Sequence, residues 1–267
     1  MIFGHKEFDD NKTYIMGILN VTPDSFSDGG LYNNMDAAME HVKEMIDEGA
    51  AIIDVGGEST RPGYTRISDE EEIRRVCPVI ERIKETFDIP VSVDTYKSGV
   101  ARAALNSGAD IVNDIWGFKA DENMAGVVAA ADAYCVLMHN REEAVYNDFV
   151  KDMVSDLAES VKLAKDAGIA DDKIMLDPGV GFGKTYENNL SAIKYVDAIR
   201  ELGYPILLAT SRKSVIGLTL DLPKDQRVEG TLATTVYGVL KGCNFVRVHD
   251  VAANKRVIDM TEAILRG

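Results

Sequence analysis

Eight short apolar runs recur along the whole chain, and each ends in a polar or glycine-rich stretch. Their β-branched residues and near-continuous hydrophobicity are typical of strands buried on both faces of a parallel sheet. Amphipathic helical patterns separate the runs, as in residues 35–46, where the apolar face ends before Gly49. The eight runs are 14–20, 51–57, 90–95, 110–115, 133–139, 173–179, 205–211 and 244–250.

Eight β-α units in 267 residues match the number and size of a TIM barrel. A doubly wound open sheet is the alternative, but it usually has fewer strands and a point where the strand order reverses. No linker, low-complexity tract or change of composition divides the chain. The sequence therefore predicts an α/β fold with a single (β/α)8 TIM-barrel domain over residues 1–267. Long loops, 20–30 and 56–68, follow the first two strands and are expected to cover the active site.

The formal net charge of −15 and the pI near 4.7 argue against nucleic acid or an acidic membrane surface as a partner, because such polyanions are repelled. An anionic substrate would need a local basic pocket. The start of the chain has no signal-peptide pattern, and no run of about 18 apolar residues would span a bilayer. The three cysteines match no zinc or disulfide spacing, which favours buried reduced thiols and a cytoplasmic location.

The stretch DPGVGFGKT, residues 177–185, is similar at first sight to the phosphate-binding loop of nucleotidases. That motif has four residues between its first Gly and the Gly-Lys pair. Gly179 and Gly183 enclose only three, and Pro178 stands at the required position. The stretch therefore does not predict nucleotide binding, and we interpret Lys184 as a solvated surface lysine.

Polar residues stand where several predicted strands end, which is where TIM-barrel enzymes carry their chemistry. Asp94, Asn113 and Asp177 would converge on one barrel mouth. Three such acceptors repel one another unless they bind a ligand rich in N–H donors, such as a flat heterocycle with amino groups. Lys213 would neutralise part of their charge.

Three other acidic residues have an equally good structural explanation. Asp114 and Asp250 follow strands and would serve as helix N-caps. Asp54 lies within the second predicted strand and would be a hydrogen-bonded structural group.

A basic group follows three strands of this acidic chain: Arg61, Arg212, Lys213, Arg247 and His249. The loops after the last two strands of a TIM barrel are its usual anion site. Arg247 and His249 are two residues apart in a strand, so their side chains point to the same side. The pattern predicts a phosphate or pyrophosphate beside the heterocycle.

The metal prediction rests on Asn20, at the end of the first strand. Together with phosphate oxygens and water, its amide oxygen would help to hold Mg²⁺. His139 has no His or Cys partner in the sequence, so a metal role is not expected there.

Seven motifs between about residues 14 and 257 resemble, in order, those of the dihydropteroate synthases of folate biosynthesis. The motifs are GILNVTPDSFSDGG, GGESTRPG, DTYKS, NDIWG, DPGVGFGKT, SRKSVIG and RVHDV. The resemblance implies a TIM barrel that condenses (7,8-dihydropterin-6-yl)methyl diphosphate with 4-aminobenzoate and releases pyrophosphate. It also implies Mg²⁺, a homodimer, and competition by sulfonamides at the aminobenzoate position.

Site residues are implied by the same motifs. The pterin would be bound by Asp94, Asn113, Met138, Asp177 and Lys213. The diphosphate would be bound by Asn20, Arg61, Arg247 and His249, with Mg²⁺ near Asn20. The 4-aminobenzoate site would be formed by Thr60, Pro62, Phe182, Lys213 and Ser214. The catalytic residues would be Asp94, Asp177, Lys213 and Arg247.

No Ser-His or Cys-His pair suggests covalent catalysis, so we expect pyrophosphate to leave first and the aromatic amine to attack a cation-like pterin. Three alternatives stay open. A methyltetrahydrofolate-corrinoid methyltransferase shares the pterin anchors but needs no diphosphate site. A sugar-phosphate isomerase would leave the ring-binding acceptors idle, and a non-catalytic pterin-binding module would not need both sets of residues.

Overall fold

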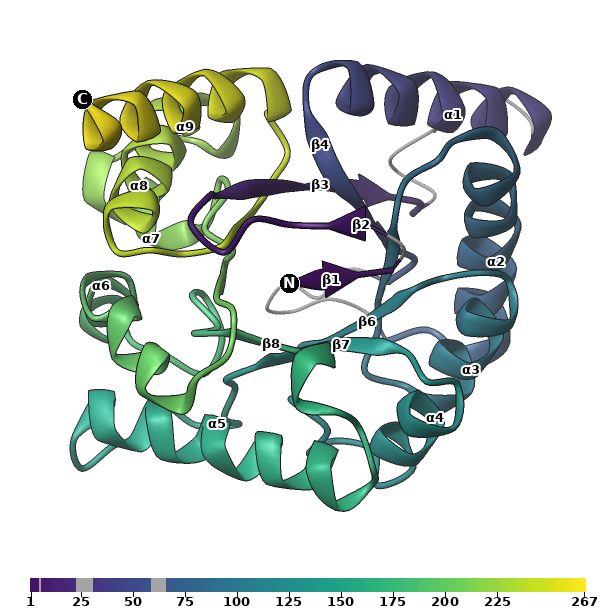
Figure 1. The fold of residues 1–267 in the computed structure, drawn as a ribbon, viewed down its shortest axis with the longest axis horizontal. Coiled ribbons are helices and arrows are strands. Elements are labelled where there is room, and N and C mark those ends of the chain that lie inside the picture. Colours follow the sequence, from purple (N-terminus) through teal and green to yellow (C-terminus); the bar gives the residue numbers. More distant parts are fainter. Residues whose placement is uncertain (5, 23–30, 59–65) are drawn as a thin grey trace.

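The computed structural model describes residues 1–4, 6–22, 31–58 and 66–267, with residues 31–34 described by their backbone alone. Among these residues, eight parallel strands form one sheet in the order β8-β7-β6-β5-β4-β3-β10-β9. An isolated parallel bridge between Leu176 and Ile206 links the two outermost strands, so the sheet is nearly closed into a barrel. The predicted α/β barrel is confirmed (Figure 1).

The eight barrel strands coincide with the eight predicted apolar runs, except that β4 begins one residue before its run, at Ala50. The strands are β3 (Tyr14–Asn20), β4 (Ala50–Gly56), β5 (Val91–Asp94), β6 (Ile111–Asp114), β7 (Tyr134–Met138), β8 (Ile174–Asp177), β9 (Leu207–Leu208) and β10 (Phe245–Val248). The run 205–211 contributes only two strand residues. Pro205 at its start cannot donate a ladder hydrogen bond, which shortens the strand from that side.

Helices surround the barrel and connect its strands (Figure 1). They are α1 (Leu31–Asp47), α2 (Asp69–Thr86), α3 (Ser98–Asn106), α4 (Met124–Ala130), α5 (Phe149–Asp166), α6 (Tyr186–Lys194), α7 (Ser214–Leu220), α8 (Val228–Leu240) and α9 (Val251–Arg266). The predicted cap of α2 is present, because the Ser68 hydroxyl accepts a hydrogen bond from the Glu71 N–H at 3.2 Å. No helix among the described residues is long and apolar enough to cross a membrane.

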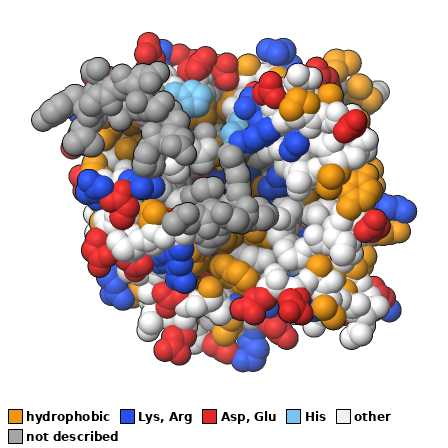
Figure 2. Space-filling model, turned by 180° about the vertical axis from the view of Figure 1, so that it is seen from behind, with side chains coloured by type: hydrophobic (Ala, Val, Ile, Leu, Met, Phe, Trp, Pro, Cys, Tyr) orange, Lys and Arg blue, Asp and Glu red, His pale blue; other side chains and the backbone are white. Residues whose placement is uncertain are grey.

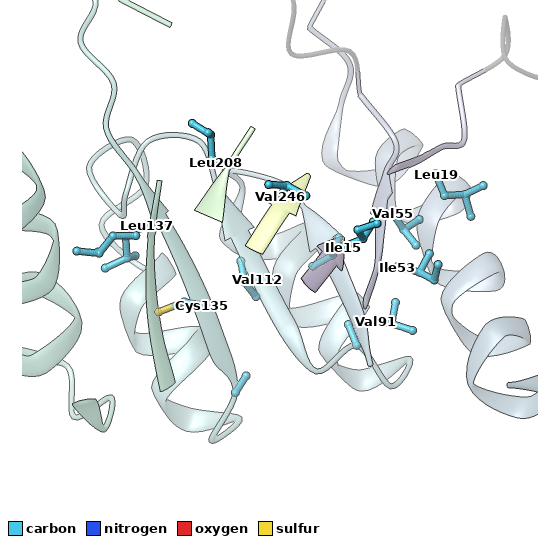
Figure 3. Close-up of a cluster of buried hydrophobic side chains, with 14 of the residues drawn as sticks. Ile15, Leu19, Ile53, Val55, Val91, Val112, Cys135, Leu137, Leu208 and Val246 are labelled. Atoms are coloured by element: carbon cyan, nitrogen blue, oxygen red, sulfur yellow. The ribbon is translucent and has the colours of Figure 1, made fainter. Parts of the chain in front are cut away.

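Strand residues alternate between two apolar layers, as the two-residue period of a strand requires. One set packs outward against the helices, and Figure 3 shows members of it, among them Ile15, Ile53, Val112 and Val246. Residues of the other set point into the barrel: Met16, Ile52, Ile111, Val136, Met175, Leu207 and Phe245. Cys77, Cys135 and Cys243 are buried free thiols, as predicted.

A short antiparallel hairpin, β1 (Ile2–Phe3) and β2 (Lys6–Glu7), lies across the N-terminal end of the barrel (Figure 1). Phe3 and Phe8 are buried, and their ring centroids lie 5.5 and 5.2 Å from that of Phe245. The hairpin thus covers the inner apolar layer at this end. This hairpin was not predicted from the sequence, because two-residue strands are too short to show an alternation of apolar and polar residues.

Candidate active site

Four inward-facing polar side chains form the floor of the barrel mouth. Asp54 on β4, Asp94 on β5, Asn113 on β6 and Asp177 on β8 are all buried. Asp94 pairs in register with Asn113 and with Gly56, so Asp54, two residues before Gly56, lies one inward-facing position deeper in the barrel. The three acceptors that the sequence predicted do meet at the mouth, and Asp54 joins them.

Arg247 on β10 reaches across the mouth and holds two of these carboxylates. Its Nε donates to Asp54 Oδ2 and its Nη2 to Asp94 Oδ2, each at 2.6 Å. Burial opposes the charge of Arg247, but Asp54 and Asp94 offset that effect and raise the pKa of Arg247 above its ordinary value. Asn113 Nδ2 also donates to Asp54 Oδ2, at 3.3 Å. The basic residue expected at the diphosphate therefore lies among the predicted pterin acceptors.

Some carboxylate oxygens at the mouth can still accept hydrogen bonds. Among the described residues, the second oxygens of both carboxylates, Asp54 Oδ1 and Asp94 Oδ1, are buried and have no hydrogen-bond partner. Burial raises the pKa of Asp94 to about 7, and the nearby Arg247 opposes this shift. Since buried unpaired acceptors are costly, the mouth is suited to a ligand that brings N–H donors.

Asp177 and Lys213 stand on the opposite side of the mouth. Asp177 Oδ1 accepts a hydrogen bond of 2.7 Å from the Gly179 N–H. Burial raises the pKa of Asp177, and Lys213 is the strongest opposing influence. Lys213 Nζ donates to the Val180 carbonyl, and burial lowers the pKa of Lys213 to about 8 although Asp177 favours its charge. The lysine therefore connects a carboxylate of the floor to the loop that follows β8.

An apolar cluster lines the mouth beside these polar groups. Buried Met138, at the end of β7, packs with Tyr96 and Ile115, and the half-buried Trp116 and Phe182 pack against them. Lys213 Nζ lies 4.9 Å from the centroid of the Phe182 ring. Such a cluster provides flat surfaces for aromatic ligands next to hydrogen-bonding groups.

The predicted anion side lies where β9 and β10 end. His249 Nδ1 is 2.9 Å from Ser211 Oγ, and burial together with Arg247 lowers the pKa of His249 to about 3. His249 is therefore neutral near pH 7 in this arrangement. Arg212 pairs with Asp250, with 3.0 Å between Nε and Oδ2. Figure 2 shows this end of the molecule, where Lys, Arg and His side chains gather.

The structure describes two of the remaining predicted site residues. Asn20 is half-buried at the end of β3, paired in register with Gly56, and Ser214 is exposed at the start of α7. The predicted residues Thr60, Arg61 and Pro62 lie outside the described residues.

The structure tests the predicted roles of three further residues. Lys184 is not a solvated surface lysine, because its Nζ lies 2.8 Å from both His139 Nδ1 and the Gly179 carbonyl oxygen. Asp114 is not a helix N-cap, because the next helix, α4, begins at Met124; it accepts hydrogen bonds from the N–H groups of Trp116 and Phe118 in the turn after β6. Asp250 pairs with Arg212, and its side chain does not cap α9.

Sequence reasoning missed Asp54 as a site residue. The signal was present, because Asp54 is two residues after Ile52 in a strand and must face the same interior. It also missed a buried ionic cluster at the base of the second long loop. Lys97 Nζ lies 2.6 Å from Glu58 Oε2 and 2.8 Å from Glu72 Oε2, and Tyr96 donates to Glu58.

Comparisons with known proteins agree with this geometry. The family described as pterin binding enzyme matches residues 16–249. The dihydropteroate synthase of Clostridium beijerinckii is 60% identical over 268 residues, covering 100% of both chains. A dihydropteroate synthase from Clostridium difficile, crystallised in the presence of pteroic acid, has a TM-score of 0.94 and 50% identity over 100% of both chains. One from Xanthomonas albilineans, with 4-aminobenzoic acid, has a TM-score of 0.92 and 40% identity, covering 97% of this chain and 95% of that one.

Proposed function

Because the chain belongs to the dihydropteroate synthases, a family of pterin-binding enzymes, we propose that it condenses (7,8-dihydropterin-6-yl)methyl diphosphate with 4-aminobenzoate. The products are 7,8-dihydropteroate and pyrophosphate. The observation that carries the substrate assignment is the set of buried acceptors at the mouth, including the unpartnered oxygens of Asp54 and Asp94. A dihydropterin ring presents the amino and ring N–H donors that such acceptors need.

The pterin ring binds on the floor of the mouth. Asp94, Asn113 and Asp177 accept from its N–H groups, Lys213 donates to its carbonyl oxygen, and Met138 packs on its face. The relative crystallised in the presence of pteroic acid supports a pterin ligand for the family. Asp54 joins this set through the hydrogen bonds it accepts from Arg247 and Asn113.

Bond breaking at the methylene carbon follows from the charges around it. The C–O bond to the diphosphate breaks, the electron pair leaves with pyrophosphate, and the remaining positive charge delocalises into the pterin ring. Asp94 and Asp177 stabilise that charge, and Lys213 holds the ring carbonyl. Arg247, Arg61 and His249 bind the departing diphosphate, so Arg247 exchanges part of its contact with the carboxylates for phosphate oxygens.

Mg²⁺ fits this site through Asn20. A half-buried amide oxygen at the rim is a sparse protein ligand set, and Mg²⁺ commonly combines such a set with substrate phosphate oxygens and water. Among the described residues no group of three or more His, Cys, Asp or Glu is arranged as a metal site. When bound, the ion supplies charge neutralisation of the leaving group.

The second substrate attacks from the rim. The neutral amine of 4-aminobenzoate forms the C–N bond to the methylene carbon, and the proton it loses goes to pyrophosphate. Thr60, Pro62, Phe182, Lys213 and Ser214 form its site, and the relative with 4-aminobenzoic acid supports this ligand for the family. The identity to these relatives favours the synthase over a corrinoid-dependent methyltransferase and over an isomerase.

Pyrophosphate release tests the function. We expect release to require both substrates and to fall strongly in Asp177→Asn and Lys213→Ala variants. Release without 4-aminobenzoate, or unchanged pterin binding in both variants, would overturn the assignment. Positional-isotope scrambling within the diphosphate, measured without the amine, tests the stepwise order, which consistent absence of scrambling contradicts.

We also propose that the protein is a cytoplasmic homodimer. Exposed leucines on neighbouring helices support association: Leu190 on α6, and Leu218 and Leu220 on α7. Buried free thiols support a reducing compartment. Analytical ultracentrifugation would show the dimer, and a monomer at all concentrations would contradict it.

A further inference from the structure

Lys184 is surrounded by acceptors behind the loop that links β8 to α6. Its Nζ lies 2.8 Å from His139 Nδ1, 2.8 Å from the Gly179 carbonyl oxygen, 3.0 Å from that of Phe182 and 3.3 Å from that of His139. Burial lowers the pKa of Lys184 to about 7, and in its charged form the amine has three donor hydrogens. They are therefore engaged by His139, directly after β7, on one side and by the loop on the other.

His139 is held so that it accepts from this ammonium group. Its Nε2 lies 3.0 Å from Asp156 Oδ2 on α5, and Asp156 is also held by Arg141 at 2.6 Å. Burial opposes the charge of Asp156, but hydrogen bonds from His139 and Arg141 lower the pKa of Asp156. Asp156 is therefore a carboxylate, and it accepts a hydrogen bond from the Nε2–H group of His139. Burial lowers the pKa of His139 to about 4, which leaves Nδ1 as a bare acceptor for Lys184.

Side chains besides Lys184 also hold the loop after β8: Lys213 donates to the Val180 carbonyl, Asn189 Oδ1 accepts from the Gly181 N–H, and Tyr146 donates to the Gly183 carbonyl. The turn of this loop is closed by one backbone hydrogen bond of 3.1 Å, from the Phe182 N–H to the Gly179 carbonyl. Gly179, Gly181 and Gly183 all have positive φ, and glycines lose more conformational freedom than other residues when they are fixed. Lys184 binds the carbonyl groups at both ends of this turn, and thereby restrains it.

The positions of Asp177 and Phe182 depend on Lys184 to different degrees. Asp177 is part of β8: its carbonyl accepts from the His139 N–H at 2.9 Å, and its carboxylate from the Gly179 N–H. Phe182 is the last residue of the turn, and its backbone carbonyl accepts a hydrogen bond from Lys184. Loss of the lysine should therefore displace the Phe182 ring more than the Asp177 carboxylate.

We propose that Lys184 is a positioning residue for the second substrate: held by His139, it fixes the turn 179–182 and so places the Phe182 ring at the mouth. The proposal rests on the proposed function for the identity of that substrate. It gives the Gly-Lys-Thr stretch a role without nucleotide, and it makes Lys184 a residue that affects the reaction without touching either substrate.

The test compares Lys184→Met, which keeps the chain length and removes the donors, with Lys162→Met, the same change at an exposed lysine of α5. We expect the KM for 4-aminobenzoate to rise about 10-fold in Lys184→Met, because buried acceptors lose a charged donor. The kcat and the pterin Kd should stay within about twofold, and Lys184→Arg, which keeps charged donors, should recover part of the loss. An unchanged KM, or an equal loss of pterin affinity, would overturn the proposal.

A second measurement does not depend on catalysis. Trp116 is the only tryptophan in the sequence and packs on the same cluster as Phe182, so acrylamide quenching of its fluorescence reports on the ring. Quenching should increase in Lys184→Met and stay at the wild-type value in Lys162→Met. If the methionine variant does not fold, Lys184→Gln replaces it, with a smaller increase expected. Failure of the proposed function would appear as absent turnover in the wild type, whereas unchanged quenching in the folded variant would reject the positioning role alone.

Discussion

The guanidinium of Arg247 lies 2.6 Å from Asp94, across the barrel mouth from the strand that carries it. The same group holds Asp54 at the same distance, so one cation keeps two buried carboxylates together before any ligand binds. Without Arg247, the like charges of these carboxylates would make the empty mouth costly. Arg247, which we propose binds the diphosphate, and the carboxylates that we propose bind the ring are thus one coupled unit, and a ligand must replace part of their pairing.

Replacement of Asp54 by Asn should weaken pterin binding about 10-fold, since a charge-assisted hydrogen bond contributes about 1.5–3 kcal/mol. Asp54 would then no longer fix the guanidinium of Arg247 in place. Isothermal titration calorimetry with a dihydropterin ligand measures the change. Asp69→Asn, at the start of α2, is the control and should bind as the wild type does. Equal affinity of Asp54→Asn and wild type would remove Asp54 from the site.

Pterin binding should depend on pH in a bell shape. Burial raises the pKa of Asp94 to about 7, so this acceptor becomes charged, and binds N–H donors better, as the pH rises through that value. Burial lowers the pKa of Lys213 to about 8, so the donor loses its charge above it. Pterin affinities measured at a series of pH values, without the second substrate, should show both the acidic and the basic limb. Asp94→Asn should remove the acidic limb, and an unchanged limb in this variant would assign it to another group.

The raised pKa of Asp94 also determines how the stability of the folded protein changes with pH. Its folded pKa lies above the ordinary value of 3.8, so the folded state binds the proton more tightly than the unfolded state. The cost of the buried charge is fully present above about pH 7 and is relieved as the pH falls toward 3.8. Asp94→Asn should therefore stabilise the free protein more at pH 8 than at about pH 5, as measured by urea denaturation.

Lys97→Met should destabilise the fold by about 3–5 kcal/mol, because it leaves buried carboxylates without their cation. Lys97 and its partners Glu58 and Glu72 have side chains that are at most 4% exposed. Lys43→Met is the matched control, since Lys43 pairs with Asp47 on the exposed face of α1 and its loss should hardly change the unfolding midpoint. Equal midpoints of urea unfolding for the two variants would contradict a structural role for Lys97.

Gly179→Ala should disrupt the loop after β8, while Gly203→Ala should be tolerated better. Both glycines have positive φ, 68° and 82°. A Cβ on Gly179 would lie 1.9 Å from the His139 carbonyl oxygen, whereas nothing lies within 4 Å of one on Gly203. Both variants carry the backbone strain of about 1 kcal/mol, but only Gly179→Ala forces β7 and the loop apart. Thermal unfolding and pterin affinity measure the difference, and similar losses in both would refute the steric account.

Much of this arrangement could be predicted from local sequence. Strand positions followed from apolar runs, and the predicted Asp94, Asn113 and Asp177 could be placed because strand ends share one rim of a barrel. The partners of charged groups could not be predicted. Lys184 looked solvated because its acceptors come from β7 and from backbone carbonyls, and Arg247 was assigned to phosphate alone because its contacts with Asp54 and Asp94 span 193 and 153 residues.

The aromatic hairpin at the N-terminal end has a kinetic consequence. With Phe3 and Phe8 filling that end, ligands enter and leave by the opposite rim only. Asp54, at the bottom of the proposed pterin site, is fully buried, whereas Phe182, in the proposed 4-aminobenzoate site, is half-buried. An amine bound first would obstruct the ring, so we expect a compulsory order: pterin diphosphate enters first and dihydropteroate leaves last. Product-inhibition patterns would reveal this order, and a random pattern would show that the rim admits both substrates side by side.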